Sequence, residues 1–471
     1  MPAKYHIAVK PVTARFPALG KSTVLDWGEG CIRCTHCVKE TCPYNAFEQR
    51  QFDRRSLTDT IDTFCKNCYR CVQGCPRELV VKALNPQYQG LGDSYWRPEI
   101  ILSTWYQAET GKIPVSGAGY GGPFTGPGFD SIWTDMSEIV RPTRDGIHGR
   151  EYISTAIDLG RKPMFLTFDD RGDVLFSPPP LVEIPLPVLL GEPPLGAAPG
   201  KMRQVLVRAA QSLGTLALLS RRVITGNLLK YIPNLVPSYS AGSLDLDDYL
   251  LSQVKAVEIL DHPGILGQLD ALKQQFPELI ACVKVPANHH AGQRLAELTA
   301  AGVEIIHLHA SEVAQGFGKA EHLHLKDLIR QCHQRLVEDH LRDTVTLLVS
   351  GGIAMAEHVP KAIICGADGV IVDLPLLIAL ECRLCRQCLG DGSCPVQMED
   401  LNVKQGTQRL VNLMGAWNNQ LLEVLGAMGM REVRRLRGEV GRAMFVEDLQ
   451  REIFAPLFER LEGEALRREP T

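Results

Sequence analysis

The sequence predicts an α/β protein whose largest unit is a closed (β/α)8 barrel, preceded by a small cysteine-rich module and followed by a helical cap. Short apolar strands alternate with amphipathic helices from about residue 180 onward, which is typical of a parallel sheet closed into a barrel. Twelve of the fifteen cysteines fall into three tight sets, two near the amino terminus and one directly after the last expected strand. A doubly wound sheet is the alternative, but no G-x-G-x-x-G segment follows an expected strand.

The barrel prediction rests on individual apolar runs. The expected strands are Pro185–Leu190, Ala256–Leu260, Leu279–Val285, Val303–Leu308, Thr344–Val349 and Gly369–Val372. The expected helices are Lys201–Leu219, His290–Ala301, His324–Asp339 and Ala356–Cys365, with a further helical stretch at Val403–Met430 in the cap. We expect four parts: a cysteine-rich module at 1–83, a Gly/Pro-rich wrapping segment at 84–179, the barrel at 180–381, and a cysteine loop with a helical cap at 382–471.

Composition narrows the classes of partner. The net charge of −4 gives no reason to expect nucleic acid or an anionic membrane as a partner. Met1–Lys10 has no apolar core of an export signal. The longest apolar runs, Leu213–Leu219 and Gly369–Leu380, are too short or too interrupted to span a bilayer. We therefore expect a cytoplasmic protein without a membrane span.

The two amino-terminal cysteine sets have the spacing of iron–sulfur ligands. They are Cys31, Cys34, Cys37 and Cys42, then Cys65, Cys68, Cys71 and Cys75, and each ends in Cys-Pro. The second set is the bacterial ferredoxin run C-x2-C-x2-C-x3-C-P, and the first has one extra residue. In two-cluster ferredoxins the fourth cysteine of each run ligates the other cluster, so we expect Cys75 to complete the first set and Cys42 the second. Zinc knuckles are the alternative.

The third set follows the last expected strand of the barrel and its helix. It consists of Cys382, Cys385, Cys388 and Cys394, spaced C-x2-C-x2-C-x5-C-P. Thiolates held two residues apart on one loop can face the irons of a single cluster. Zinc and disulfides are the alternatives. We interpret this loop as an iron–sulfur site beside the barrel.

Several residues of the barrel are placed to bind a flavin. In a barrel, ligands bind at the carboxyl ends of the strands. Ser350, Gly351 and Gly352 end one strand and offer bare backbone N–H groups to a phosphate, and Gly366–Gly369 lies one helix later. Lys284 ends an earlier strand, where its ammonium can stabilise negative charge on a reduced flavin ring. These features favour FMN.

At these positions the chain resembles the FMN-binding synthase domain of glutamate synthase. The resemblance rests on V-K-V at Val283–Val285, L-V-S-G-G-I at Leu348–Ile353, C-G-A-D-G-V-I-V at Cys365–Val372 and the cysteine loop. It implies a TIM barrel holding FMN with an iron–sulfur cluster against the flavin. It also implies Lys284 as a flavin contact, and it places Ser350, Gly351, Gly352, Gly366 and Ala367 around the phosphate. The four-cysteine loop is similar to that of the short archaeal-type relatives, which favours a four-iron over a three-iron cluster.

The loops that would cover the substrate depart from that family. H-A-S-E-V-A-Q-G-F-G-K-A, from His309 to Ala320, replaces a glycine-rich substrate loop. Two further family loops are reduced to Thr225–Asn227 and Asp261–Gly264, and the chain has no amidotransferase domain. The chain therefore retains the family's motifs for binding the cofactor, whereas the sequences of its substrate loops differ.

Two functions are compatible with these residues. In the first, a glutamate-synthase-like oxidoreductase passes electrons from the ferredoxin-type module through the third cluster to FMN and reduces a keto or imino acid. Arg141, Arg144 or Lys319 would neutralise the substrate carboxylates, and an amidotransferase or other ammonia-supplying partner would be needed. In the second, the chain is an electron-transfer subunit of a larger redox complex and has no organic substrate of its own. Both require a redox partner, such as a ferredoxin or an oxidoreductase subunit.

Overall fold

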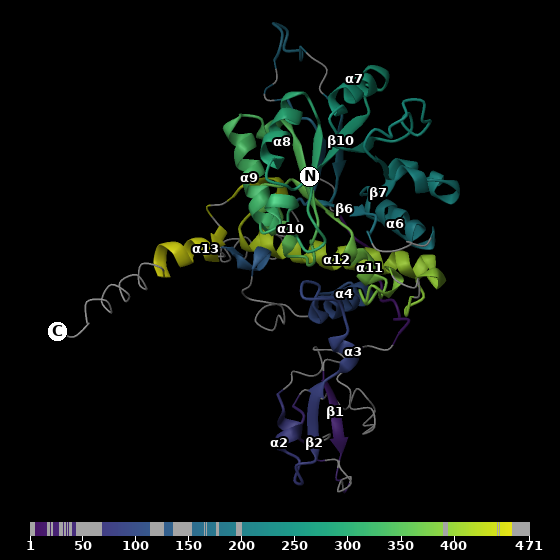
Figure 1. The fold of residues 1–471 in the computed structure, drawn as a ribbon, viewed down its shortest axis with the longest axis vertical. Coiled ribbons are helices and arrows are strands. Elements are labelled where there is room, and N and C mark those ends of the chain that lie inside the picture. Colours follow the sequence, from purple (N-terminus) through teal and green to yellow (C-terminus); the bar gives the residue numbers. More distant parts are fainter. Residues whose placement is uncertain are drawn as a thin grey trace, which may run out of the picture.

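The centre of the molecule is a closed barrel of eight parallel strands (Figure 1). The computed structural model describes residues 5–16, 68–113, 127–134, 153–163, 179–194, 200–389, 394–439 and 443–454, with isolated residues and short stretches at 19–43, 165–175 and 441. The strands are β6 (Val188–Gly191), β7 (Ala217–Ser220), β8 (Leu235–Tyr239), β9 (Ala256–Leu260), β10 (Ile280–Pro286), β11 (Ile305–His309), β12 (Thr346–Ser350) and β13 (Gly369–Val372). Their order around the barrel is β10-β11-β12-β13-β6-β7-β8-β9. The predicted barrel is confirmed.

The helices of the barrel follow the expected alternation. They are α6 (Gly200–Leu213), α7 (Ile265–Gln275), α8 (Ala291–Ala300), α9 (Leu325–Glu338), α10 (His358–Ile364) and α11 (Leu374–Ala379). A 3-10 segment, η7 (Gly226–Asn234), stands in place of a helix between β7 and β8. The strands are almost continuously buried, as expected for a parallel sheet covered on both faces.

Two barrel strands were not predicted from the sequence. The helix expected at Lys201–Leu219 ends at Leu213, because Gly214 takes a positive φ of 66° and stops it, and Ala217 then begins β7. Strand β8 contains Pro237, a residue that argues against a central strand because it cannot donate to a sheet.

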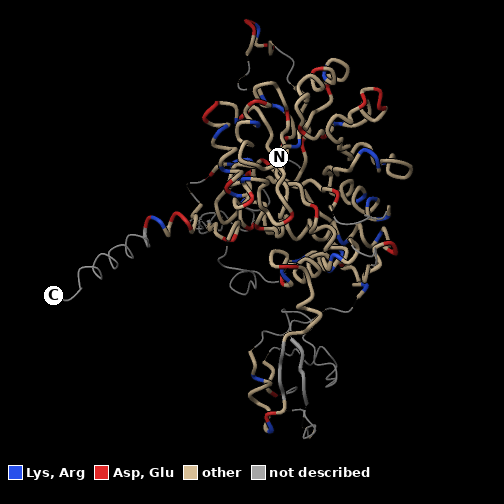
Figure 2. Tube along the Cα trace, viewed as in Figure 1, with Lys and Arg blue, Asp and Glu red and all other residues tan. Residues whose placement is uncertain are grey.

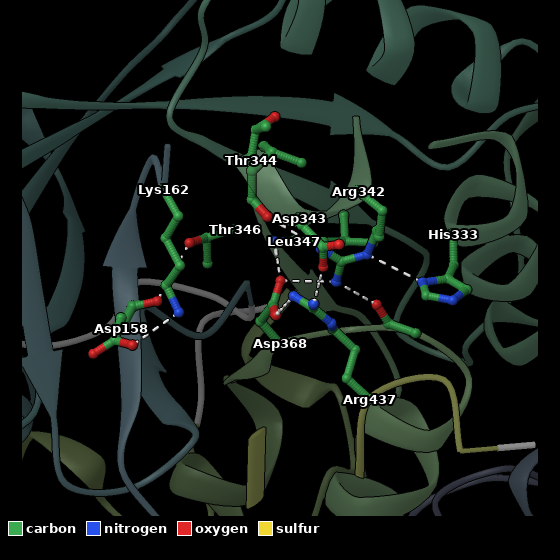
Figure 3. A network of polar contacts seen from close by, with 12 residues as sticks. Asp158, Lys162, His333, Arg342, Asp343, Thr344, Thr346, Leu347, Asp368 and Arg437 are labelled. Carbon is green, nitrogen blue, oxygen red and sulfur yellow. Dashed lines mark hydrogen bonds and ion pairs between the residues drawn. The ribbon is translucent and has the colours of Figure 1, made fainter. Parts of the chain in front are cut away.

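A hairpin and an ionic network lie at the amino end of the barrel. Strands β4 (Ile157–Gly160) and β5 (Leu181–Ile184) pair antiparallel, and the hydroxyl of Thr346, the first residue of β12, donates to the carbonyl of Gly160 over 2.8 Å. The close-up in Figure 3 shows Thr346 and Asp158 of β4 beside the cluster of Arg342, Asp368 and Arg437. Polar contacts therefore stabilise the amino end of the barrel.

The long helix α12 (Val403–Ala427) packs across the outside of the barrel and joins the remaining parts. It lies against α6 and against α4 (Pro98–Thr110), a helix inside the segment that we expected to be a Gly/Pro-rich wrapping segment (Figure 1). The Asn412 side chain, fully buried on α12, donates to the carbonyls of Lys10 and Ala108 over 2.7 and 2.9 Å. Strand β14 (Ala443–Phe445) pairs antiparallel with β3 (Ile132–Thr134), and α13 (Val446–Leu449) follows it.

The amino-terminal module extends away from the barrel below α3 (Pro86–Gln89) in Figure 1. Strand β1 (Ser22–Trp27) pairs antiparallel with β2 (Val80–Leu84), and the short helix α2 (Arg70–Gln73) precedes β2. Both amino-terminal cysteine sets therefore lie in the chain between two paired strands. Whether they form the ferredoxin-type module that we expect stays a prediction.

Charged residues of both signs are interspersed over the barrel helices (Figure 2). Within the described part of the chain, no helix combines the length and the apolar character needed to cross a membrane.

Candidate functional site

The predicted site residues of β10 and β12 lie at one end of the barrel. Lys284 pairs in register with His307 of β11, and Ser350 pairs with His309 of the same strand. Each lies within two residues of the carboxyl end of its strand. Lys284, Ser350, Gly351 and Gly352 therefore lie at the same end of the barrel, the carboxyl ends of its strands; that they bind a ligand there stays a prediction.

The turn after β12 requires glycine at both positions. Gly351 and Gly352 have positive φ values of 100° and 66°. A Cβ on Gly351 would lie 2.4 Å from the carbonyl oxygen of Ala310, and a Cβ on Gly352 would lie 2.4 Å from the backbone nitrogen of Ala314. The loop that follows β11 is thus packed directly against this turn, and neither glycine can be replaced without moving it.

Gly366 and Ala367 lie elsewhere, so the expectation that they surround the same phosphate is wrong. They precede β13, at the amino end of the barrel, whereas Ser350 and its glycines follow β12 at the carboxyl end. The Gly366 carbonyl accepts from Arg342 over 2.6 Å, and a Cβ on Gly366 would lie 2.4 Å from the His333 Cβ. Gly366 therefore contacts Arg342 and His333, which Figure 3 shows close to Asp368.

The ionic network around Asp368 is structural. The partly buried Asp368 carboxylate accepts from Arg342 over 2.8 Å, from Arg437 over 2.9 Å and from the Leu347 N–H over 2.7 Å. Burial opposes its ionisation, but the two arginines outweigh burial and lower the pKa of Asp368. Arg437 comes from the carboxyl-terminal part of the chain, so the contact ties that part to the barrel.

Lys284 offers an ammonium group near the carboxyl end of its strand. Nearby arginines are already paired: Arg203 with Glu192, Arg221 with Asp248, and Arg294 with Asp261. The Lys284 carbonyl accepts from the Asp261 N–H over 2.9 Å, but its ammonium group makes no hydrogen bond or ion pair with the described residues, although the residue is only partly exposed. A half-buried ammonium without a partner fits an anionic or electron-rich ligand, and the flavin expected there is such a group.

A chain of four hydrogen-bonded polar side chains crosses the inside of the barrel beneath Lys284. The Ser238 hydroxyl donates to Glu258 Oε1 over 2.7 Å, Glu258 Oε2 lies 2.5 Å from His307 Nδ1, and His307 Nε2 lies 2.7 Å from the Ser350 hydroxyl. Glu258 and His307 are each about 2% exposed. Four strands, β8, β9, β11 and β12, contribute one residue each.

The charge on this chain follows from its surroundings. Burial opposes ionisation of Glu258, but His307, Lys284 and Ser238 outweigh it and lower the pKa of Glu258 to about 2. Burial lowers the pKa of His307, and Lys284 adds to this effect, so His307 is neutral at pH 7. A neutral ring next to a carboxylate carries its proton on Nδ1, so Nε2 accepts from Ser350. The hydroxyl of Ser350 therefore has a fixed orientation.

Two further titratable groups face the same end. Burial and Lys284 lower the pKa of His309 to about 3, so its ring is neutral, and it lies 5.2 Å from the Phe317 ring between centroids. Asp373 follows β13 and is partly buried, and its burial together with Glu312 raises its pKa to about 6. Lys284 therefore lies among one anion, Glu258, two neutral imidazoles and a carboxyl group that titrates near neutrality.

The third cysteine set forms a loop of unusual backbone shape after α11. Glu381, Leu384, Arg386 and Gln397, none of them glycine, all take positive φ values of 46° to 73°. The Leu384 N–H donates to the Cys382 sulfur over 3.4 Å. Burial raises the pKa of the Cys382 thiol to about 12, and the thiols of Cys385, Cys388 and Cys394 add to this effect.

These features fit an iron–sulfur cluster, because its ligands are cysteine thiolates and backbone N–H groups donate to the sulfurs in such sites. Strained backbone conformations are also concentrated at functional sites. Among the described residues, no three His, Cys, Asp or Glu side chains converge on the position of a single metal ion. The amino-terminal sets are only partly described: Cys34, Cys42, Cys68, Cys71 and Cys75 belong to the described residues, and Cys31, Cys37 and Cys65 lie outside them. The Leu79 N–H donates to the Cys75 sulfur over 3.4 Å, as Leu384 does to Cys382.

The candidate substrate cations are not brought together. Arg141 and Arg144 lie outside the described residues, and Lys319 is exposed in η8 (Gly318–Ala320). Glu258, His307, His309 and Asp373 were missed from the sequence. A signal for Glu258 and His307 was present in the sequence, because each is a charged or polar residue inside a short apolar strand, as Lys284 is. In a barrel whose outer face is covered by helices, such a side chain is expected to point to the inside.

The comparisons with known proteins agree with this arrangement. The family described as "Conserved region in glutamate synthase" matches residues 243–431, which include β9 to β13 and the third cysteine set. Together with the relatives below, this match supports a relationship of the chain to glutamate synthases. An archaeal-type glutamate synthase (NADPH) of Dehalococcoides mccartyi is 26% identical over 468 residues, 87% of this chain and 92% of its own length. An archaeal glutamate synthase (NADPH) of Archaeoglobus fulgidus is 27% identical over 491 residues, 90% of this chain and 94% of its own length.

These relatives indicate an oxidoreductase enzyme. Among solved structures, a mandelate oxidase has a TM-score of 0.40 at 14% identity, covering 65% of this chain and 98% of its own. A flavocytochrome b2 has a TM-score of 0.42 at 12% identity, covering 67% of this chain and 81% of its own. Both TM-scores are below 0.5, so the fold assignment rests on the closed barrel itself.

Proposed function

We propose that the chain is a glutamate-synthase-like iron–sulfur flavoprotein that passes electrons from the amino-terminal module, through a cluster on Cys382, Cys385, Cys388 and Cys394, to FMN. The final step is reduction of a keto or imino acid to an amino acid. The observation that carries the proposal is the Lys284 ammonium near the carboxyl end of β10, without a partner among the described residues. The helix after the last strand of the same barrel, α11, leads into the loop that carries four cysteines. The relatives named as glutamate synthases support the same reaction class.

The described residues would divide the work as follows. Lys284 would hold a positive charge beside the flavin ring, and Gly351 and Gly352 would let the backbone approach the phosphate. Bound FMN would supply chemistry that accepts electrons singly or in pairs. Glu258 and His307 would keep Ser350 in one orientation below this site. The four cysteines of the loop would ligate a four-iron or three-iron cluster, and the two amino-terminal sets would ligate two four-iron clusters.

The second candidate is an electron-transfer subunit without an organic substrate. The observation that favours it is the loop after β11, in which Ala310 and Ala314 pack against the Gly351–Gly352 turn. The glycine-rich substrate loop of the family would occupy that position. Either function needs a redox partner, and the first also needs a source of ammonia.

One preparation separates the possibilities. Anaerobically purified protein is expected to hold one FMN and about twelve irons with as many acid-labile sulfides, if all three sets bind four-iron clusters. The reduced protein is then mixed with 2-oxoglutarate and ammonia, and with other keto acids, while flavin reoxidation is followed. Reoxidation by a keto acid with ammonia supports the synthase. Reoxidation only by an electron acceptor such as a ferredoxin supports the subunit, and stoichiometric zinc with little iron contradicts both.

A further inference from the structure

A short segment before α4 lies between the third cysteine set and the carboxyl end of the barrel. Its shape is fixed internally: the Asp93 carboxylate accepts from the N–H groups of Tyr95 and Trp96 over 2.9 and 2.8 Å. Gly92 takes a positive φ of 64°, and a Cβ there would lie 1.8 Å from the Trp96 carbonyl oxygen. The segment is therefore a rigid turn that presents two aromatic side chains.

Both aromatic side chains are bonded to the barrel. The Tyr95 hydroxyl donates to the carbonyl of Gly352 over 2.5 Å, and the Trp96 indole N–H donates to the carbonyl of Glu312 over 3.0 Å. Trp96 is fully buried, and the two rings meet edge to face with centroids 5.6 Å apart. Gly352 belongs to the turn after β12, and Glu312 belongs to the loop after β11 that packs against that turn.

The same segment is bonded to the cysteine loop on its other side. The Gly92 N–H donates to the carbonyl of Arg383 over 3.0 Å. The Arg386 guanidinium lies between Cys385 and Cys388 in the chain, and it bonds the carboxylates of Glu312 over 3.0 Å and Asp93 over 3.3 Å. Arg386 has a positive φ of 57°, so its position depends on the strained backbone of the cysteine loop.

We propose that Tyr95, Trp96 and Arg386 form a clasp through which the cysteine loop positions the Gly351–Gly352 turn. When a cluster fills the loop, Arg386 is held against Glu312 and Asp93, and Tyr95 holds the Gly352 carbonyl, so the turn is ordered to receive a phosphate. Cluster assembly and FMN binding are then coupled, and by linkage each strengthens the other. This inference rests on the proposed function, since it takes FMN and the third cluster as the two ligands. Tyr95 and Arg386 act as positioning residues.

The experiment is a set of FMN titrations of the full-length protein, followed by flavin fluorescence. Tyr95→Phe removes one hydrogen bond and is expected to raise the Kd for FMN about fivefold, as expected for loss of about 1 kcal/mol. Cys385→Ser, in which loss of the third cluster is checked by iron content, is expected to raise the Kd by a similar factor. The double variant is expected to be little weaker than either single variant, because both changes break the same connection.

Two further variants keep the inference testable. Tyr5→Phe also removes a tyrosine hydrogen bond, from the Tyr5 hydroxyl to the Leu213 carbonyl at 2.7 Å, and it is expected to leave the Kd unchanged. Arg386→Gln keeps Tyr95 and all cysteines but cuts the link, so it is expected to reproduce the Tyr95→Phe effect. Multiplicative effects in the Tyr95→Phe, Cys385→Ser double variant, or an unchanged Kd in Tyr95→Phe or Arg386→Gln, would overturn the clasp. Wild-type protein that binds no FMN would instead contradict the proposed function.

Discussion

Replacing Glu258 by Gln is expected to lower the free energy of unfolding by about 3 kcal/mol at pH 7. The substitution keeps the shape of the side chain but removes the charge that accepts from His307 and Ser238. The pKa of Glu258 is lowered in the folded state, so the folded protein stabilises the carboxylate over the protonated carboxyl group. Loss of a hydrogen bond to a charged group costs about 1.5 to 3 kcal/mol by itself, which agrees with this magnitude.

The pH dependence provides an independent check on the same residue. Because the folded-state pKa of Glu258 is depressed, its contribution is complete well above pH 4.5 and is lost as the pH falls toward 2. About 1 kcal/mol of it is expected to be lost by pH 4, where most of the unfolded chains already carry the proton. The difference between wild type and Glu258→Gln is therefore expected to shrink by that amount between pH 7 and pH 4.

The assay is urea unfolding of both proteins at pH 7 and pH 4, with Glu297→Gln as the control. Glu297 is a half-exposed carboxylate paired with Arg294 over 3.1 Å, so its replacement is expected to cost less than about 1 kcal/mol. If Glu258→Gln is no more destabilising than this control, or if its effect is the same at both pH values, Glu258 is not the buried anion of the barrel.

Two other predictions concern the two ends of the barrel. Lys284→Ala is expected to weaken FMN retention or to lower the flavin midpoint potential, because the reduced ring loses its nearby cation; unchanged flavin content and potential would show that Lys284 does not contact the flavin. Arg437→Gln is expected to lower the free energy of unfolding by about 1 to 2 kcal/mol without changing FMN affinity, since Asp368 keeps Arg342 as a partner. Arg335→Gln, which breaks only an exposed pair with Asp339, is the matched control, and an equal effect of the two variants would contradict a structural role for Arg437.

The barrel was predictable from the sequence because burial on both faces makes its strands apolar throughout, as in I-A-C-V-K-V-P of β10. The exceptions have local causes. Strand β8 was not predicted because it contains Pro237. The start of β7 was not predicted because the helical pattern before Gly214 was extended through it. Helix α4 carried correct signals, Pro98 at its first turn and Gly111 at its end, but it lies in a Gly- and Pro-rich context that masked them.

The positions of candidate site residues were predictable where a motif coincides with the carboxyl end of a strand, as for Lys284 and for Ser350 with its two glycines. They were not predictable where a motif begins before a strand and runs through it, because the residues before the strand then lie at the opposite end of the barrel. The sequence favours Gly366–Gly369 as a phosphate site, but Gly366 and Ala367 precede β13, and only Asp373 lies at the carboxyl end of that strand. The pairing of Glu258 with His307 could not be inferred either, because the two residues are 49 positions apart and meet only when the barrel closes.

The account depends most on the order of the electron path, and Cys385→Ser tests that order directly. The amino-terminal clusters are expected to assemble normally in this variant, since their ligands lie more than 300 residues upstream. Stopped-flow measurement of flavin bleaching, with a reduced donor protein docked at the amino-terminal module, is expected to show no FMN reduction, whereas direct chemical reduction of the flavin persists. FMN reduction at the wild-type rate, with spectroscopy showing the third cluster absent, would contradict the relay through Cys382, Cys385, Cys388 and Cys394.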